Sequence, residues 1–124
     1  MRLPSRLRLK ESRDFAVIKA QGQSQSGRYF VLALLRDEAM ADFRFGLVTG
    51  KRLGNAVVRN RLRRQIREII RENRASIVPG MKFVTIARWR APTAEFAEMS
   101  QDWTRLARRM GLLLKPAKLG ASTP

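Results

Sequence analysis

The stretch KRLGNAVVRNRLRR, residues 51–64, combines a dense run of basic residues with the apolar spacing of an amphipathic helix. If the helix runs from about Ala56 to Asn73, its apolar side chains fall within one arc about 120° wide at 100° per residue. They are Val58, Leu62, Ile66, Ile69 and Ile70. The sequence therefore predicts a long helix that buries one face in a core and carries basic side chains on the other.

Four arginines repeat at every fourth position of this predicted helix, so like charges lie above one another on its surface. This arginine ladder consists of Arg59, Arg63, Arg67 and Arg71. Like-charge pairs at this spacing destabilise a helix by about 0.2–0.5 kcal/mol each, and Glu68 and Glu72 offset only part of the repulsion. One interpretation is a solvated basic face. The other is a polyanionic ligand that neutralises the ladder.

Two further features favour a polyanion over a solvated face. Lys51 and Arg52 lie in a glycine-bracketed loop just before the helix, where free backbone N–H groups attract phosphate. Arg59 falls inside the apolar arc, but it belongs to the first turn, where its side chain can leave the edge of the core. Both features concentrate positive charge at the start of the helix.

The composition supports the same interpretation. The chain of 124 residues carries 26 basic and 10 acidic residues, for a formal net charge of +16. It has 20 Arg and 6 Lys, and arginine is the better bidentate ligand for phosphate and also stacks on bases. Affinity for a polyanion through such a surface should fall steeply as salt rises.

The residue types that are missing exclude several functions. The chain has no Cys and no His, so disulfides, thiolate catalysis and Cys/His zinc sites are ruled out. The usual general acid or base at neutral pH is also missing. No apolar run is long enough to span a membrane, and the basic N-terminus lacks the apolar stretch of a signal peptide. We therefore expect a cytoplasmic protein with no membrane partner.

The remaining sequence predicts one α/β domain over residues 1–124, with helices packed on a small sheet. Residues 1–10 are expected to form a basic, mostly irregular arm, and residues 115–124 a flexible tail. The predicted elements are a helix over 12–21, a loop or edge strand over 23–27, strands over 28–35, 43–49 and 81–89, and a last helix from Pro92. The strands over 28–35 and 43–49 are close in sequence, so we expect them to form an antiparallel pair.

The aromatic residues raise a choice between core packing and stacking on nucleic-acid bases. We assign four of them to the core, namely Phe43, Phe45, Trp89 and Trp103. Phe15 fits either role when the residues alone are considered.

Residues 51–64 resemble the signature of the bacterial ribonuclease P protein component, whose hallmark is an Arg-Asn-Arg triplet, here Arg59, Asn60 and Arg61. The resemblance extends along nearly the whole chain. It includes Asp14-Phe15, Arg28, Phe30, Gly46-Leu47 and Ile86-Ala87-Arg88. Because the triplet lies within this long match, it is far more specific than an isolated Arg-Asn-Arg.

The resemblance implies an α+β two-layer sandwich in the order helix, three strands, helix, strand, helix. It also implies a left-handed βαβ crossover and a ribosomal-protein-S5-domain-2-like topology. The implied function is that of an RNA-binding subunit, one per catalytic RNA, of an endoribonuclease that removes the 5′ leader from precursor tRNA. Catalysis then resides in the RNA, and Mg²⁺ is held mainly by RNA phosphates.

Two binding surfaces follow from the same resemblance. The motif helix faces the catalytic RNA, with candidate contacts Lys51, Arg52, Asn55, Arg59, Asn60, Arg61, Arg63, Arg64 and Arg67. A cleft between the first helix and the sheet holds the leader, with candidate contacts Phe15, Lys19, Arg28 and Tyr29. Family members often carry aromatics where this chain has Lys19 and Ala33. Tyr29 has the strand parity of Ala33 and could stand in for the second aromatic.

Two other functions are compatible with the composition. A self-sufficient nuclease needs acidic residues to hold its metal ions, and the 10 present form no motif such as paired Asp on adjacent strands. A structural ribosomal or DNA-binding protein would share the basic composition. Comparing the binding of precursor tRNA, mature tRNA and duplex DNA would separate this last class.

Overall fold

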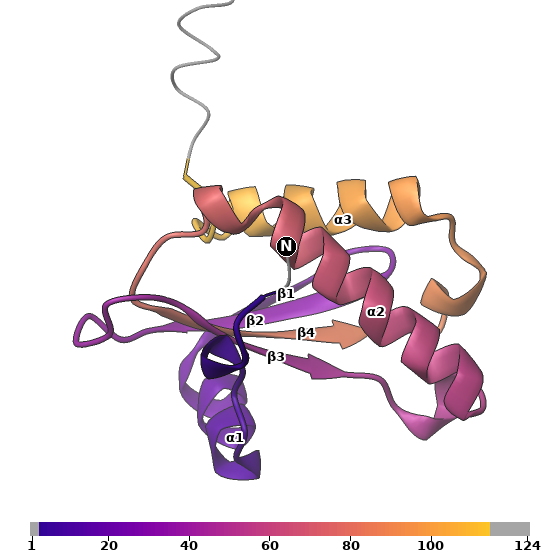
Figure 1. Cartoon of the computed structure of the whole chain (residues 1–124), viewed down its shortest axis with the longest axis horizontal. Coiled ribbons are helices and arrows are strands. Elements are labelled where there is room, and N and C mark those ends of the chain that lie inside the picture. The colour runs from indigo at the N-terminus through magenta and orange to yellow at the C-terminus, as the bar shows by residue number, and fades with distance from the viewer. Residues whose placement is uncertain (1–2, 115–124) are drawn as a thin grey trace, which may run out of the picture.

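The computed structural model describes residues 3–114, which form three α-helices and one four-stranded sheet (Figure 1). The order of the elements is the predicted one. They are α1 (Ser12–Gln21), β1 (Gln23–Ser26), β2 (Phe30–Arg36), β3 (Arg44–Val48), α2 (Ala56–Glu72), β4 (Met81–Ala87) and α3 (Phe96–Arg109). The polar segment after α1 is thus an edge strand, one of the two alternatives that the sequence allowed.

The sheet has the strand order β1-β2-β4-β3, so the predicted antiparallel pair of β2 and β3 is wrong. β4 lies between them, antiparallel to β2 and parallel to β3. The physical reason is that β4 is buried on both faces of the sheet. Five of the seven β4 side chains are buried, as befits a central strand, whereas β1 consists only of Gln and Ser and occupies an edge. Proximity in sequence therefore did not decide which strands pair.

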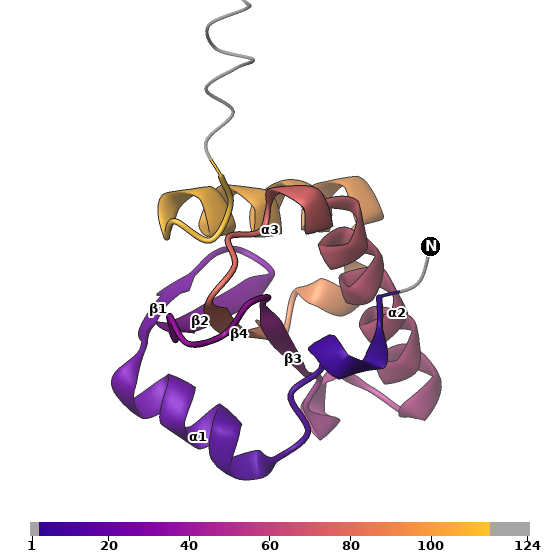
Figure 2. The same ribbon diagram turned by 60° about the vertical axis from the view of Figure 1, so that its left-hand side comes forward.

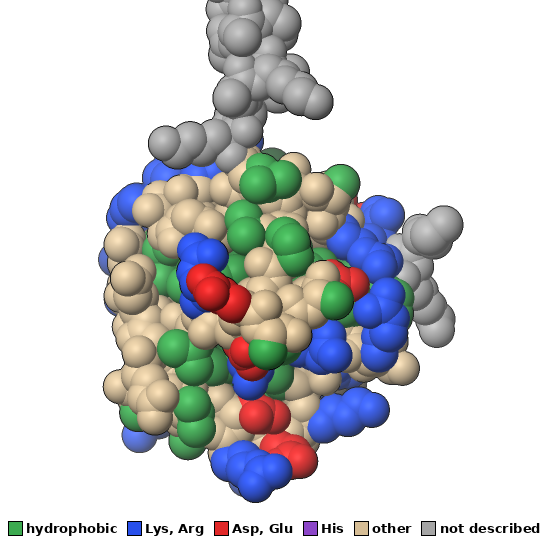
Figure 3. All heavy atoms as spheres, turned by 90° about the vertical axis from the view of Figure 1, so that its left-hand side faces the viewer, with side chains coloured by type: hydrophobic (Ala, Val, Ile, Leu, Met, Phe, Trp, Pro, Cys, Tyr) green, Lys and Arg blue, Asp and Glu red, His purple; other side chains and the backbone are tan. Residues whose placement is uncertain are grey.

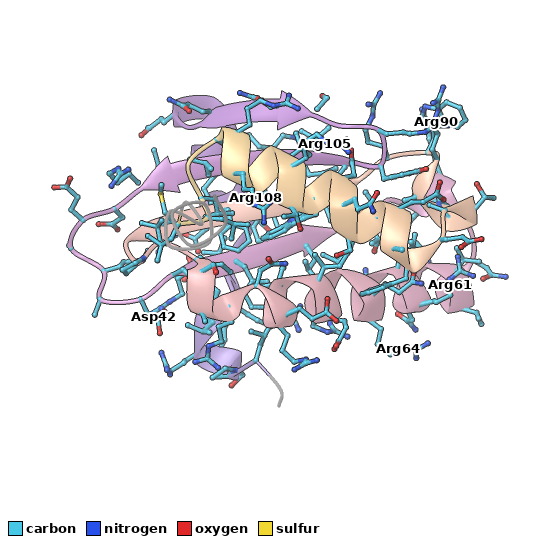
Figure 4. All side chains as sticks on the ribbon, turned by 90° about the horizontal axis from the view of Figure 1, so that it is seen from above. Asp42, Arg61, Arg64, Arg90, Arg105 and Arg108 are labelled. Atoms are coloured by element: carbon cyan, nitrogen blue, oxygen red, sulfur yellow. The ribbon has the colours of Figure 1, made fainter. Side chains whose placement is uncertain are left out.

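Helix α2 connects two parallel neighbours, β3 and β4, and packs on the same side of the sheet as α3 (Figure 4). Seen from that side with both strands pointing the same way, β4 lies to the left of β3. The crossover is therefore left-handed, as the resemblance implied, although right-handed crossovers dominate in proteins.

The two faces of the sheet are covered differently, with α2 and α3 on one face and α1 on the other (Figures 1 and 2). The larger core lies under α2 and α3, and Leu62, Ile66 and Ile70 of α2 are fully buried there, as their spacing predicts. Trp103 of α3 is also fully buried, and its Nε1–H donates a hydrogen bond to Thr85 Oγ1 at 3.0 Å. Under α1, the fully buried cluster among residues 3–114 is small and consists of Ile18, Ala33 and Val84.

The core assignment is confirmed for Phe43, Phe45 and Trp103 and is wrong for Trp89, which is 70% exposed. The predicted strand over 81–89 ends at Ala87, and the chain then turns. Trp89 therefore leaves the sheet before its side chain can join either face.

The N-terminal arm is more ordered than expected in its described part. Ser5–Leu7 form a short 3-10 helix, and the side chain of Leu7 is fully buried in the larger core. The Leu9 N–H donates a hydrogen bond to the Phe45 carbonyl at 2.8 Å. Residues 3–9 therefore pack along the outer edge of β3, and the predicted tail over 115–124 lies outside the described residues.

The last helix begins later than predicted. Ala91–Thr93 form a separate 3-10 turn, and α3 starts at Phe96. The backbone N–H of Glu95 donates a hydrogen bond to Glu98 Oε1 at 3.2 Å, which caps the helix at this point. Pro92 therefore belongs to the loop that leads from β4 to α3.

Candidate nucleic-acid interface

The loop before α2 presents two exposed basic side chains next to the start of the helix. Lys51 and Arg52 belong to a 3-10 turn (Lys51–Leu53) that ends at Gly54, where φ is 146°. Asn55 is the N-cap, because its Oδ1 accepts a hydrogen bond from the Val58 N–H at 3.0 Å. The predicted RNA contact Asn55 therefore already has a structural task, which is to fix where α2 begins.

The three side chains of the Arg-Asn-Arg triplet lie in three different environments, because successive helical residues point about 100° apart. Arg59 is half-buried, and its Nε is buried with no hydrogen-bond partner within residues 3–114. Asn60 is exposed, and its Oδ1 accepts a hydrogen bond from Arg63 Nη1 at 3.3 Å. Arg61 Nη2 donates to the Pro92 carbonyl at 2.7 Å, which attaches α2 to the loop after β4.

A groove with a volume of about 600 Å³ lies beside the basic face of α2. It lies between α2, β3 and the N-terminal arm. Its lining residues are Leu3, Ser5, Arg8, Phe45, Arg64, Arg67, Glu68 and Arg71. Figure 3 shows basic side chains gathered along the side of the molecule where α2 and the arm lie. Arg8 is not among the predicted contacts, because only the pairing of the arm with β3 brings it to this groove.

The arginine ladder is not uniform along α2. Arg71, near the C-terminal end, donates from Nε to Glu68 Oε1 at 2.9 Å, and this hydrogen bond lowers the pKa of Glu68 and raises the pKa of Arg71. Within residues 3–114, no carboxylate forms an ion pair with Arg59 or Arg63. The positive charge of the ladder is therefore compensated at its end and uncompensated at its start.

The first helix places Phe15 against the other face of the sheet. Its half-buried ring lies directly over Gly46 of β3, where a Cβ atom would come within 2.6 Å of the Phe15 Cζ. Only glycine at this position lets the ring rest on the strand. Lys19 is exposed one turn further along α1 and shares the face of Phe15.

The other two predicted leader contacts lie elsewhere, at the turn between β1 and β2. Asp102 of α3, only 4% exposed, accepts hydrogen bonds from the backbone N–H groups of Arg28 and Tyr29, both at 2.9 Å. It also accepts one from the Phe30 N–H at 3.3 Å. This carboxylate therefore holds the turn against α3.

Tyr29 does not share a face with Ala33, because β2 begins only at Phe30 and the strand parity does not extend to residue 29. Its side chain is 7% exposed and belongs to the larger core under α3. Arg28 is exposed, with its guanidinium 5.7 Å from the centroid of the Tyr29 ring. The four predicted leader contacts thus form two groups, with Phe15 and Lys19 on α1 and Arg28 and Tyr29 beside α3.

The described residues offer no cluster of acidic side chains for a metal ion. Within residues 3–114, no three carboxylates come together in that way. None of the helices formed by the same residues combines the length and apolar character that crossing a membrane requires.

A basic, capped helix on a left-handed crossover is what the resemblance of residues 51–64 implies. A comparison with family models tests whether the whole chain belongs to that family. The family model for Ribonuclease P matches residues 3–111. The chain belongs to the ribonuclease P protein family. The family assigns it to the protein component of a ribonucleoprotein endoribonuclease that acts in tRNA processing, in partnership with the ribonuclease P RNA.

Relatives and solved structures agree with this membership of the ribonuclease P family. The ribonuclease P protein component of Bacillus cereus (strain B4264) is 35% identical over 105 residues, which cover 85% of this chain and 91% of the relative. That of Exiguobacterium sibiricum is 34% identical over 111 residues, covering 90% and 96%.

Two solved structures show the same fold. The RNase P protein of Staphylococcus aureus superposes with a TM-score of 0.81 at 28% identity, covering 86% of this chain and 97% of that one. The RNase P protein of Thermotoga maritima gives a TM-score of 0.75 at 32% identity, covering 82% and 96%. The α+β architecture of this chain is therefore that of bacterial ribonuclease P proteins.

Proposed function

We propose that this chain binds the catalytic RNA of ribonuclease P through the start of α2, and the 5′ leader of precursor tRNA through α1. The observation that carries the proposal is the uneven charge of α2. Arg71 is engaged by Glu68, whereas Arg59 keeps a buried Nε without a partner among the described residues. A phosphate would satisfy that donor and neutralise the uncompensated end of the ladder.

The start of α2 is suited to RNA phosphates for a second reason. The first turn of a helix carries backbone N–H groups that no helical carbonyl satisfies, and Asn55 accepts only one of them through its side chain. The exposed side chains of Lys51 and Arg52 flank this turn. Backbone N–H groups, a guanidinium and two flexible cations together form an anion-binding surface.

The leader is proposed to lie against α1 and the sheet face below it. Phe15 offers a half-exposed ring on which a base can stack, and Lys19 offers a cation for the backbone of the same strand. Ala33 is buried beside Ile18 and Val84, so it presents no stacking surface. We therefore propose that charge contributes more than stacking to leader binding in this chain.

In this proposal the chemistry belongs to the RNA. Mg²⁺ held by RNA phosphates supports hydrolysis, and one protein per RNA lowers the repulsion between phosphates. The protein then supplies no nucleophile and no general base, and it acts where precursor tRNA is made, in the bacterial cytoplasm.

The decisive experiment compares cleavage of precursor tRNA by the catalytic RNA at low Mg²⁺, with and without the purified protein. We expect faster removal of the leader with the protein, and no cleavage by the protein alone. Absence of any gain would overturn the proposal. Metal-dependent cleavage by RNA-free protein would instead identify a self-sufficient nuclease.

A matched pair of variants tests which part of α2 binds the catalytic RNA. Arg59→Ala should weaken assembly and reduce the slope of log affinity against log salt by about 1. Arg71→Ala, which removes an arginine already paired with Glu68, should change both quantities much less. Equal losses for the two variants would argue against a binding surface centred on the start of α2.

A further inference from the structure

Trp89 leaves 70% of its surface exposed, although it has one of the largest apolar side chains in the protein. The other tryptophan, Trp103, is fully buried and hydrogen-bonded to Thr85. Burying apolar area stabilises a folded protein, so a fixed, exposed indole forgoes a substantial stabilisation. Neither leader binding nor the arginine ladder makes use of this side chain.

The indole ring is held by its neighbour. The guanidinium carbon of Arg90 lies 4.6 Å from the centroid of the Trp89 ring, within the range of a cation–π contact. One guanidinium covers at most one face of an indole. The contact therefore orients the ring and leaves its exposed surface available to a planar ligand.

The loop that carries Trp89 is firmly attached to the rest of the protein. The Arg88 N–H donates to the Tyr29 carbonyl at 2.8 Å, and the Arg88 side chain donates to the Gly27 carbonyl. The Ala91 N–H donates to the Arg88 carbonyl at 2.9 Å, which closes the turn at Trp89. A platform built on such a loop loses little entropy when a ligand binds.

The same loop adjoins the start of α2. Arg61 donates to the Pro92 carbonyl at 2.7 Å, and Figure 4 shows Arg61 and Arg90 at the same end of the molecule. RNA bound at the first turns of α2 would therefore reach the end of the molecule that carries the loop of Trp89.

The charges around this end favour a nucleic acid. The basic side chains in its loops are those of Arg28, Lys51, Arg52, Arg88 and Arg90, and the acidic ones at the start of α3 are those of Glu95 and Glu98. A single indole framed by cations suits a base attached to a phosphate chain. A protein partner would require a broader apolar surface.

We infer that Trp89 and Arg90 form a stacking platform for an unpaired nucleobase of single-stranded RNA. It is separate from Phe15, which lies over Gly46 at the level of Val84 in the parallel register of β3 and β4. Trp89 follows the end of β4, at least three residues or about 10 Å further along. The source of the RNA rests on the proposed function, whereas stacking on Trp89 can be tested without the catalytic RNA.

Tryptophan fluorescence reports on this platform directly. A short unstructured RNA should quench the emission of the protein, because Trp89 is exposed and Trp103 is not. A blunt RNA duplex of the same length should quench much less, since its bases are already stacked. In Trp89→Phe, the same single strand should bind nearly as tightly while the remaining emission stays constant.

Affinity measurements complete the test. Trp89→Ala should weaken binding of the single strand by about 5- to 150-fold, because stacking contributes about 1–3 kcal/mol per base. Trp89→Lys, which keeps a long side chain and adds charge, should not restore the affinity. The control Leu114→Ala removes another exposed apolar side chain, next to Ser76 in the 3-10 turn after α2, and should have no effect.

Three results would overturn the inference: unchanged affinity of Trp89→Ala, full affinity of Trp89→Lys, or equal quenching by single-stranded and duplex RNA. Because Trp89 is exposed, its replacement should leave the fold intact, and the near-ultraviolet signal of Trp103 checks this. The cleavage assay separates the two proposals. If the protein accelerates cleavage but Trp89→Ala binds RNA normally, only the platform fails; if quenching occurs without acceleration, the proposed function fails.

Discussion

The two faces of the sheet differ in how completely their apolar side chains are covered. Under α2 and α3, the ring of Trp103 and the side chains of Leu62 and Ile66 are fully buried. Under α1, Phe15 and Ile86 remain partly exposed around the small buried cluster of Ile18, Ala33 and Val84. The face under α2 and α3 is sealed, and the face under α1 is open.

The sealed face mainly stabilises the fold, and the open face keeps a surface that a ligand can bind. A sealed face gains the full free energy of burial, but it offers no surface to a ligand. An open face forgoes part of that free energy and keeps apolar surface beside cations such as Lys19. Substitutions on the sealed face should therefore mainly lower the free energy of unfolding, whereas substitutions on the open face should mainly affect RNA binding.

The largest effect is expected for Trp103→Ala on the sealed face. It should lower the free energy of unfolding by about 3–5 kcal/mol, because it creates a cavity. It also removes the partner of the buried Thr85 hydroxyl. Urea denaturation measures the loss. The comparison between the faces would break down if Phe15→Ala on the open face were equally destabilising.

The next effect concerns Asp102, which joins α3 of the sealed face to the turn between β1 and β2. Asp102→Ala leaves three backbone N–H groups without their acceptor and should cost about 2–3 kcal/mol. Hydrogen exchange locates the loss, since the amides of residues 28–30 should exchange faster than those of β4. Unchanged exchange at these amides would show that water replaces the carboxylate without cost.

On the open face, Gly46→Ala should push the Phe15 ring off β3, because the new Cβ would lie 2.6 Å from Cζ. We expect a cost of about 1–3 kcal/mol from this overpacking. The double variant Gly46→Ala with Phe15→Ala should recover part of the stability, since the clash is gone. Additive losses in this double-mutant cycle would contradict direct contact as the cause.

Phe15→Ala alone should have a smaller effect on stability, about 1 kcal/mol, because the ring is only half-buried. Its main effect should be a reduced preference for precursor over mature tRNA, measured by filter binding. Trp103→Ala is no suitable control here, because it should destabilise the whole fold. Leu114→Ala, which removes an exposed apolar side chain beside Ser76 on the side of the larger core, is the surface control and should leave the preference unchanged.

The smallest effect is a pH dependence at the edge of the sheet, where neither face is involved. The pKa of Asp42 is lowered chiefly by the Phe43 N–H, which donates to its Oδ1 at 2.8 Å, and further by Arg6. A lowered pKa in the folded state means that the stabilisation is present above the unfolded pKa and is lost as pH falls through the folded value. Asp42→Asn should remove this dependence, at most about 0.5 kcal/mol, from stability curves measured between about pH 2 and pH 7. Identical curves for both proteins would show that Asp42 contributes nothing.

The order of the elements and the apolar face of α2 could be predicted from the sequence, because both follow from the local spacing of apolar residues. Leu62, Ile66, Ile69 and Ile70 are all buried as their spacing predicts. The pairing of β4 between β2 and β3 was not predictable in this way, since periodicity shows which side chains are apolar and not which strands are neighbours.

The candidate binding residues also differ in whether neighbouring or distant parts of the chain determine their positions. The clustering of Lys51, Arg52 and Arg59 near the start of α2 could be predicted, because these residues are close in the chain. The positions of Tyr29 and Trp89 could not. The position of Tyr29 depends on its hydrogen bond to Asp102, which is 73 residues away. The position of Trp89 depends on where β4 ends.

The pairing of the N-terminal arm with β3 has a consequence for the protein before it meets any RNA. A sheet edge with free N–H and C=O groups is a template on which another chain can add a strand and start to aggregate. The Leu9 N–H occupies the Phe45 carbonyl on one edge, and the opposite edge is the short polar strand β1. Both edges are therefore poor templates for strand addition, which lowers the tendency of the protein to self-associate in the absence of RNA.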